Sequence, residues 1–104
     1  MGYPRPKPER LAEKLRQIRD ALGLSQGEML RRLGLEDTIE LKRISDYELG
    51  KNEPPLVVLL QYARVAAINM EALVDDELNL PRQLPSDVNH QHLRRKYTTP
   101  TRHR

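Results

Sequence analysis

With 104 residues, the chain has room for one domain and little more. It contains no Cys, Phe or Trp, which excludes disulfides and thiolate metal sites and leaves a core built mostly from Leu, Ile, Val and Ala. This composition favours a helical bundle over a β-sandwich. The longest apolar run, Leu56–Leu60, is far too short to span a bilayer. No basic-then-apolar leader opens the chain, so we expect a cytoplasmic protein.

The formal net charge of +3 is unevenly distributed along the chain. Residues 1–10 carry three basic and one acidic side chain, and residues 82–104 carry six basic and one acidic. The middle, residues 11–81, carries nine basic and thirteen acidic side chains. Basic arms on a mildly acidic body are typical of a nucleic-acid binder with flexible ends, and two solubilising tails explain the same pattern.

The N-terminal half begins with an arm and a helix. Residues 1–8 hold three prolines, which predicts an extended arm. A helix is predicted over roughly 9–22, where apolar residues recur at helical spacing, and Gly23 is expected to end it. The stripe consists of Leu11, Leu15, Ile18 and Leu22.

A second, shorter helix is predicted over about 26–33. Ser25 and Glu28 have the spacing of a capping box, in which each side chain bonds a backbone N–H of the first turn. Gly34 supplies the positive-φ residue that ends the helix. Its inward face consists of Met29, Leu30 and Leu33.

Residues 35–48 allow two interpretations. A helix starts at Thr38 behind a second capping box, or it begins near Leu41 after a loop whose two apolar residues, Leu35 and Ile39, turn inward. We favour the loop, because Ile39, Leu41 and Ile44 do not share a clean helical stripe with Tyr47. The helix, about 41–48, then turns Ile44 and Tyr47 inward at a spacing of i, i+3. It ends at Gly50, and Pro54 and Pro55 forbid its continuation.

Two further helices are predicted before the C-terminal tail. One covers about 56–67, with Leu56, Leu59, Leu60, Ala63 and either Ala66 or Ala67 facing inward. The other runs from Met70, behind Asn69 as N-cap, to about Leu78. Three acidic residues at its end oppose the helix dipole, so we expect fraying there unless a basic partner covers them. From Pro81 onward the composition predicts a disordered or extended segment.

Several motifs together resemble the Cro/phage-repressor (Xre-like) helix-turn-helix regulators over about residues 9–78. They are Leu24-Ser25-Gln26, Leu33-Gly34 and the run Ile44 to Lys51, ISDYELGK. Two features depart from the family: Leu30 stands where a small residue is usual, and the spacing from Gly34 to Glu48 is about four residues longer. The resemblance implies an all-α, compact five-helix bundle of the lambda-repressor-like type. It would have a basic arm at 1–8, the DNA-binding domain at 9–78 and a basic, Pro-rich tail at 79–104.

The resemblance also implies which residues contact DNA. Gln26 and its backbone N–H would hold a phosphate at the start of the 26–33 helix, while the 41–48 helix enters the major groove. Lys42 or Arg43 would donate to guanine and Asp46 would accept from cytosine. Further candidate contacts are Ser45 on the same face, Tyr47 through its hydroxyl, Lys51 and Asn52 in the following loop, and Arg5 and Lys7 on the arm.

The leading hypothesis is a sequence-specific, double-stranded-DNA-binding transcriptional regulator of the repressor type that acts as a homodimer. Candidate dimer-facing residues are Leu73, Val74, Leu78 and Leu80. The alternative is a protein-interaction module, such as an antitoxin, whose tail at 81–104 binds another protein. All three histidines lie at position 90 or beyond, and the pair His90 and His92 lacks further ligands nearby. We therefore expect no catalysis, no metal and no cofactor.

Overall fold

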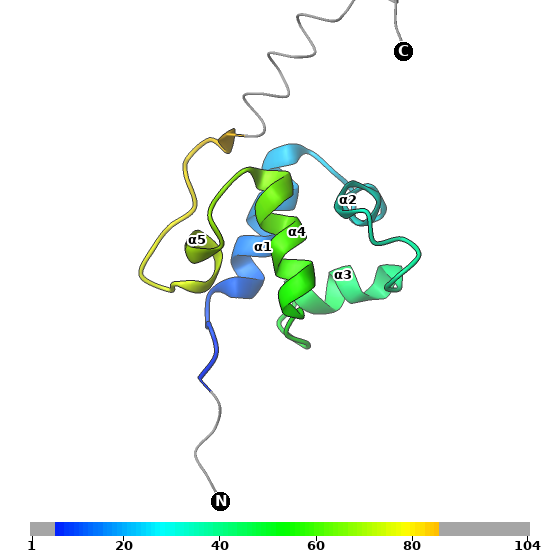
Figure 1. Ribbon diagram of the computed structural model, residues 1–104, viewed down its shortest axis with the longest axis horizontal. Coiled ribbons are helices and arrows are strands. Elements are labelled where there is room, and N and C mark those ends of the chain that lie inside the picture. The colour runs from blue at the N-terminus through cyan, green and yellow to red at the C-terminus, as the bar shows by residue number, and fades with distance from the viewer. Residues whose placement is uncertain (1–5, 86–104) are drawn as a thin grey trace, which may run out of the picture.

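The computed structural model describes residues 6–85, and its secondary structure in that range is entirely helical (Figure 1). The helices are α1 (Leu11–Leu22), α2 (Gln26–Leu33), α3 (Leu41–Glu48), α4 (Leu56–Ala66) and α5 (Met70–Val74). The predicted all-α class and the expected bounds of the second and third helices are confirmed. None of the helices in the described range is long and apolar enough to cross a membrane.

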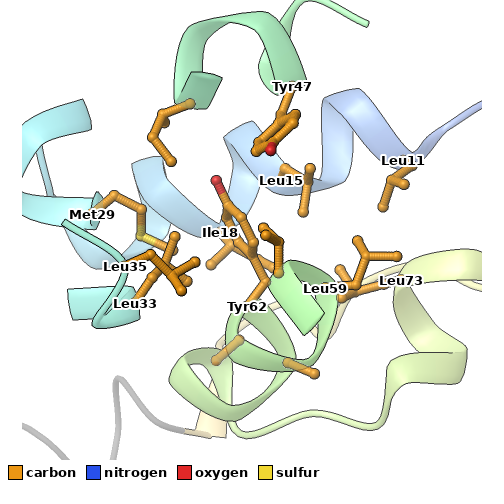
Figure 2. Packing of buried hydrophobic residues seen from close by; sticks show 14 of the residues in the cluster. Leu11, Leu15, Ile18, Met29, Leu33, Leu35, Tyr47, Leu59, Tyr62 and Leu73 are labelled. Atoms are coloured by element: carbon orange, nitrogen blue, oxygen red, sulfur yellow. The ribbon is translucent and has the colours of Figure 1, made fainter. Parts of the chain in front are cut away.

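Helix α1 is the element against which α3 and α5 pack. Its predicted stripe is confirmed: Leu11, Leu15 and Ile18 are all buried, while Leu22 packs against the core from its edge. The spacing of these residues aligns them on one side of the helix, as the 3.6-residue period requires. Figure 2 shows Leu15 and Ile18 facing the residues of α4 across the core.

Helix α2 is delimited by the two signals predicted for it. The Ser25 hydroxyl accepts from the backbone N–H of Glu28 at 3.0 Å, and the Glu28 carboxylate accepts from that of Ser25 at 2.8 Å. The bond from the Ser25 backbone is the main reason why the pKa of Glu28 lies below its ordinary value. At the other end, Gly34 has φ +74°, a conformation that an L side chain rarely adopts.

The link between α2 and α3, residues 34–40, is a loop, which confirms the favoured interpretation. The carbonyl of Leu35 accepts from the backbone N–H groups of Thr38 at 2.9 Å and Ile39 at 3.0 Å, so the link closes into a turn of its own. Leu35 is buried and lies beside Met29 and Leu33 (Figure 2), and Ile39 packs against the same core. The extra residues of the link therefore add to the core.

The inward face of α4 is the predicted one in part: Leu59, Ala63 and Ala66 are buried as expected. Its buried residues are Val58, Leu59, Tyr62, Ala63 and Ala66, whereas Leu56 is 75% exposed and Leu60 only partly buried. The expectation that Leu56 faces inward is therefore wrong. The run of apolar residues at the start of α4 fits several faces, and the large ring of Tyr62 selects the one that it fills (Figure 2).

The hydroxyl of Tyr62 is fully buried and has no hydrogen-bond partner among residues 6–85. Burial raises the pKa of this phenol, so the group stays neutral. Because a buried hydroxyl without a partner retains its desolvation cost, Tyr62→Phe is expected to raise the free energy of unfolding by about 1 kcal/mol. Urea unfolding checks this, and a loss of stability would instead reveal a bonding partner for the hydroxyl.

Helix α5 ends at Val74, earlier than predicted, and Asp75 takes an extended conformation. The basic partner needed at this end is Lys14 of α1, whose side chain is fully buried. Its ammonium donates to the carbonyls of Ala72 and Asp75 at 2.8 Å each. A cation at the C-terminal carbonyls of a helix satisfies them and offsets the helix dipole. Burial is the main cause of the lowered pKa of Lys14.

Asp76, one of the three acidic residues that follow α5, also caps the start of α1. The carboxylate of Asp76 accepts from the backbone N–H groups of Glu9 at 2.9 Å and Arg10 at 3.0 Å. In return, the Arg10 guanidinium donates to the carbonyl of Asp76 at 2.8 Å and to the side chain of Asn79 at 2.8 Å. The start of α1 and the end of α5 are thus joined by bonds in both directions.

These bonds give stability a defined pH dependence. The backbone N–H groups of Glu9 and Arg10 hold the pKa of Asp76 below its ordinary 3.8. A depressed pKa stabilises the fold above the unfolded value and loses that contribution as pH falls through the folded value. We expect Asp76→Asn to be less stable than wild type at pH 5 to 7, with the gap narrowing below about pH 3.8. Urea unfolding across this range measures the gap, and a gap independent of pH would contradict the assignment.

Residues after position 78 also contribute to the core. Leu84 is 2% exposed and belongs to the core cluster, and Leu80 packs against it. The segment after Pro81 was expected to be disordered or extended, yet its first residues return to the helices as far as position 85. The rest of the tail, 86–104, lies outside the described residues, as do His90 and His92.

Candidate nucleic-acid interface

Helix α3 is held to the body of the protein by one side. Ile44 is fully buried and Tyr47 is 4% exposed, which confirms the predicted inward pair at i, i+3. Lys42 and Arg43 are exposed, whereas Ser45 and Asp46 are partly exposed. The helix therefore presents two basic side chains outward.

An internal ion pair fixes the end of α3 against the start of α2. Glu48 accepts from Arg19 Nε at 2.6 Å and from Arg19 Nη2 at 2.9 Å, and its side chain is only 4% exposed. Arg19 also donates to the carbonyl of Leu24 at 3.0 Å, just before α2. The partner of Glu48 lies on α1, 29 residues away in the sequence, and no local pattern indicates this pairing.

Gln26, the predicted phosphate contact, belongs to the same network. Its side-chain nitrogen donates to Glu48 Oε1 at 3.2 Å. The side chain is therefore oriented by α3 while the backbone N–H groups of the first turn of α2 point along the helix axis, where no intrahelical carbonyl can reach them. This arrangement keeps the N-terminus of α2 and the outer face of α3 in a fixed relation.

Three further candidates contact one another. The Arg43 guanidinium lies 3.8 Å from the carboxylate of Asp46, one helical turn along α3. In the amide orientation that gives both its oxygen and its nitrogen a partner, Asn52 accepts from Arg43 Nη1 at 2.8 Å and donates to the carbonyl of Lys51 at 3.0 Å. The opposite orientation places its nitrogen 3.3 Å from Asp46, but then directs it at the guanidinium. We adopt the first, in which Arg43 is held from two sides.

These pairings change the charge that α3 presents. The segment 36–48 contains five acidic and two basic residues. Glu48 is neutralised by Arg19 and Asp46 lies beside Arg43, so the exposed acids are those of the link, Glu36, Asp37 and Glu40. The outer face of α3 itself is therefore less acidic than the sequence alone indicates.

The arm and the loop after α3 meet at one hollow, although their basic residues are more than forty positions apart. Lys7 of the arm and Lys51 and Asn52 of the loop all line this open space of about 320 Å³. Tyr47 lines it as well, and burial raises the pKa of its phenol, so the hydroxyl is neutral. Arg5, the other arm candidate, lies outside the described residues.

Comparison with known protein families gives the class of this arrangement. A family model described as helix-turn-helix matches residues 15–73, more than half of the chain and all of α2, α3 and α4. The chain belongs to this helix-turn-helix family, whose fold is lambda-repressor-like and whose domains bind DNA. The resemblance to Cro/phage-repressor regulators is thereby confirmed. Comparison with curated proteins and with solved structures gave no match.

Proposed function

We propose that this protein is a sequence-specific regulator of transcription that reads double-stranded DNA with α3. The observation that carries the proposal is the placement of α3, whose Ile44 side is buried while Lys42 and Arg43 stand exposed on the other. A helix anchored on one face and basic on the other can enter the major groove, about 12 Å wide, without disturbing the core. The Arg19–Glu48 pair then sets its position relative to α2.

The contacts divide the candidate residues by role. Lys42 and Arg43 donate to the acceptor atoms of guanine, and Asp46 with Asn52 orients the Arg43 guanidinium. Ser45 lies on the same partly exposed side of α3 and serves either a base or a phosphate. Where a base contact draws Arg43 away, Asp46 accepts from cytosine.

The remaining contacts go to the DNA backbone. Gln26 and the first N–H groups of α2 hold one phosphate, favoured by the positive end of the helix dipole. Lys51, Asn52 and Lys7 bind a second phosphate at the hollow between loop and arm, which Tyr47, Glu9 and Glu53 also line. Arg5 extends the arm along the duplex. These contacts add affinity that depends on salt and not on sequence.

Selection of random duplexes by the purified chain tests the proposal, with enrichment of a defined sequence as the expected result. On the selected duplex, Lys42→Ala should cost about 1–3 kcal/mol and relax the preference at one position. Lys51→Ala should weaken all duplexes alike and reduce the salt slope by about 1. Arg64→Ala, at an exposed arginine on α4, is the matched control and should change neither. Weak binding to all duplexes without enrichment would contradict the proposal.

A further inference from the structure

The large apolar side chains that are exposed in residues 6–85 lie at a few places on the surface. They are Leu41, Leu49, Leu56, Val57, Val74 and Leu78. Leu73, expected to face a dimer partner, is fully buried instead, so that expectation is wrong. Of the exposed set, Leu41 is the one at the N-terminal end of α3, the helix proposed to read DNA, and it is 50% exposed there.

The local course of the chain explains why Leu41 is left at the surface. Ile39 packs against the core, and Glu40 takes an extended conformation that turns the chain into α3. Ile44, three residues after Leu41, is buried, whereas Ser45, four residues after it, is partly exposed. Residues at these spacings are neighbours on a helix surface. Leu41 therefore lies at the border between the buried side of α3 and the side that carries Ser45.

Charged side chains flank Leu41 in the sequence. Glu40 and Lys42 are both exposed, whereas the side chain of Leu41 can neither donate nor accept a hydrogen bond. The N-terminal residues of a recognition helix are those that reach the base edges in the major groove. Leu41 is therefore brought to the groove together with Lys42, and covers the base edge that it meets there.

The chemistry of the major groove limits what Leu41 can contact favourably. The one apolar group that an ordinary base pair presents there is the C5-methyl group of thymine. The other groups are hydrogen-bond donors and acceptors, and covering one of these with an aliphatic side chain leaves it without a partner, which costs free energy. Contact with the methyl group instead removes apolar surface of both partners from water and stabilises the complex.

Resting on the proposed function, we infer that Leu41 packs against the C5-methyl group of a pyrimidine in the major groove. This contact makes Leu41 a specificity-determining residue whose chemistry differs from that of Lys42 and Arg43, which donate hydrogen bonds. Thymine and 5-methylcytosine carry the same methyl group, whereas uracil and cytosine lack it. The chain should therefore distinguish thymine from uracil and, at the same position, methylated from unmethylated cytosine. Burial of one methyl group corresponds to about a fourfold change in affinity.

Fluorescence anisotropy with the duplex selected from random sequences tests the inference. Each thymine of the enriched sequence is replaced in turn by deoxyuridine, which removes the methyl group and keeps every hydrogen-bonding group of the base. At the position that Leu41 contacts, wild type should bind the uracil duplex about fourfold more weakly. With cytosine opposite guanine at that position, methylation of the cytosine at C5 should tighten binding by about the same factor.

Variants of the two leucines assign the effect. Leu41→Ala should bind the thymine and uracil duplexes nearly equally, whereas Leu41→Met keeps a long apolar side chain and should retain most of the preference. Leu49→Ala, the same truncation at the exposed C-cap of α3, is the matched control and should discriminate as wild type does. Since both leucines are at least 50% exposed, circular dichroism should show unchanged helix content in all three variants.

Three outcomes would overturn the inference. In the first, the enriched sequence contains no thymine, or uracil is tolerated at every thymine. In the second, Leu41→Ala still discriminates against uracil as wild type does, so that another residue or the shape of the duplex is responsible. In the third, Leu49→Ala loses the discrimination as Leu41→Ala does. An enriched sequence that is indifferent to uracil defeats this inference alone, whereas failure to enrich any sequence defeats the proposed function and the inference with it.

Discussion

Arg19→Met is expected to lower the free energy of unfolding by about 3 kcal/mol, the low end for breaking a buried ion pair. The substitution leaves the carboxylate of Glu48, which is 4% exposed, with the Gln26 amide as its remaining side-chain donor. An uncompensated charge in such a place costs more than the pair contributes. Urea unfolding at neutral pH measures the effect.

The chain provides a matched control for this substitution. Arg16 forms an ion pair with Asp20 on the same helix at 3.6 Å, but both side chains are at least 60% exposed. Arg16→Met should therefore cost less than about 1 kcal/mol. The double variant Arg19→Met, Glu48→Leu should recover much of the lost stability, because no charge stays buried. Equal losses at Arg16 and Arg19 would show that the pair at Glu48 has no special role.

Ile44→Ala is expected to cost about 3 kcal/mol, within the usual range for truncating a buried aliphatic side chain. Ile44 is fully buried and, with Tyr47, attaches α3 to the core. The smaller truncation Ile44→Val should cost about 1 kcal/mol. Leu41→Ala, at a half-exposed position on the same helix, should change stability by less than about 1 kcal/mol. Thermal or urea unfolding gives all three values.

The same series relates packing to DNA binding. If α3 reads DNA, loosening its attachment to the core should weaken binding to the selected duplex. The loss should be small in Ile44→Val and larger in Ile44→Ala. The variants must be compared where each is still folded, because lost binding would otherwise report unfolding. Unchanged sequence preference in folded Ile44→Ala would indicate that another element reads the bases.

The local features of the fold could be predicted because their causes lie within a few residues. The capping box at Ser25, the positive-φ glycine at 34 and the stripe on α1 each depend on short-range spacing. The start of α3 near Leu41 could be predicted because the apolar residues of 35–48 do not share a single helical stripe. Helix α4 was predicted as an element, but its inward face was only partly right, since the consecutive apolar residues at its start allow several faces.

The features that could not be predicted join distant parts of the chain. Lys14 carries no sign in the sequence that it will be buried against carbonyls 58 and 61 positions later. The sequence likewise does not indicate that Glu48 pairs with Arg19, or that Lys7 and Lys51 line the same hollow. For the candidate site, the inward pair of α3 was foreseen, whereas the contacts among Arg43, Asp46 and Asn52 depend on where the loop folds back.

The bonds that join the beginning of α1 to the end of α5 bear on the order in which the protein can form during translation. The N–H groups of residues 9 and 10 emerge from the ribosome early, while the carboxylate that accepts from them lies 67 and 66 positions later. Local turns can form at once, but a contact between residues so far apart in the sequence can form only after α5 has been synthesised. A nascent chain that stops before residue 76 therefore lacks the hydrogen bonds that join the start of α1 to the segment after α5.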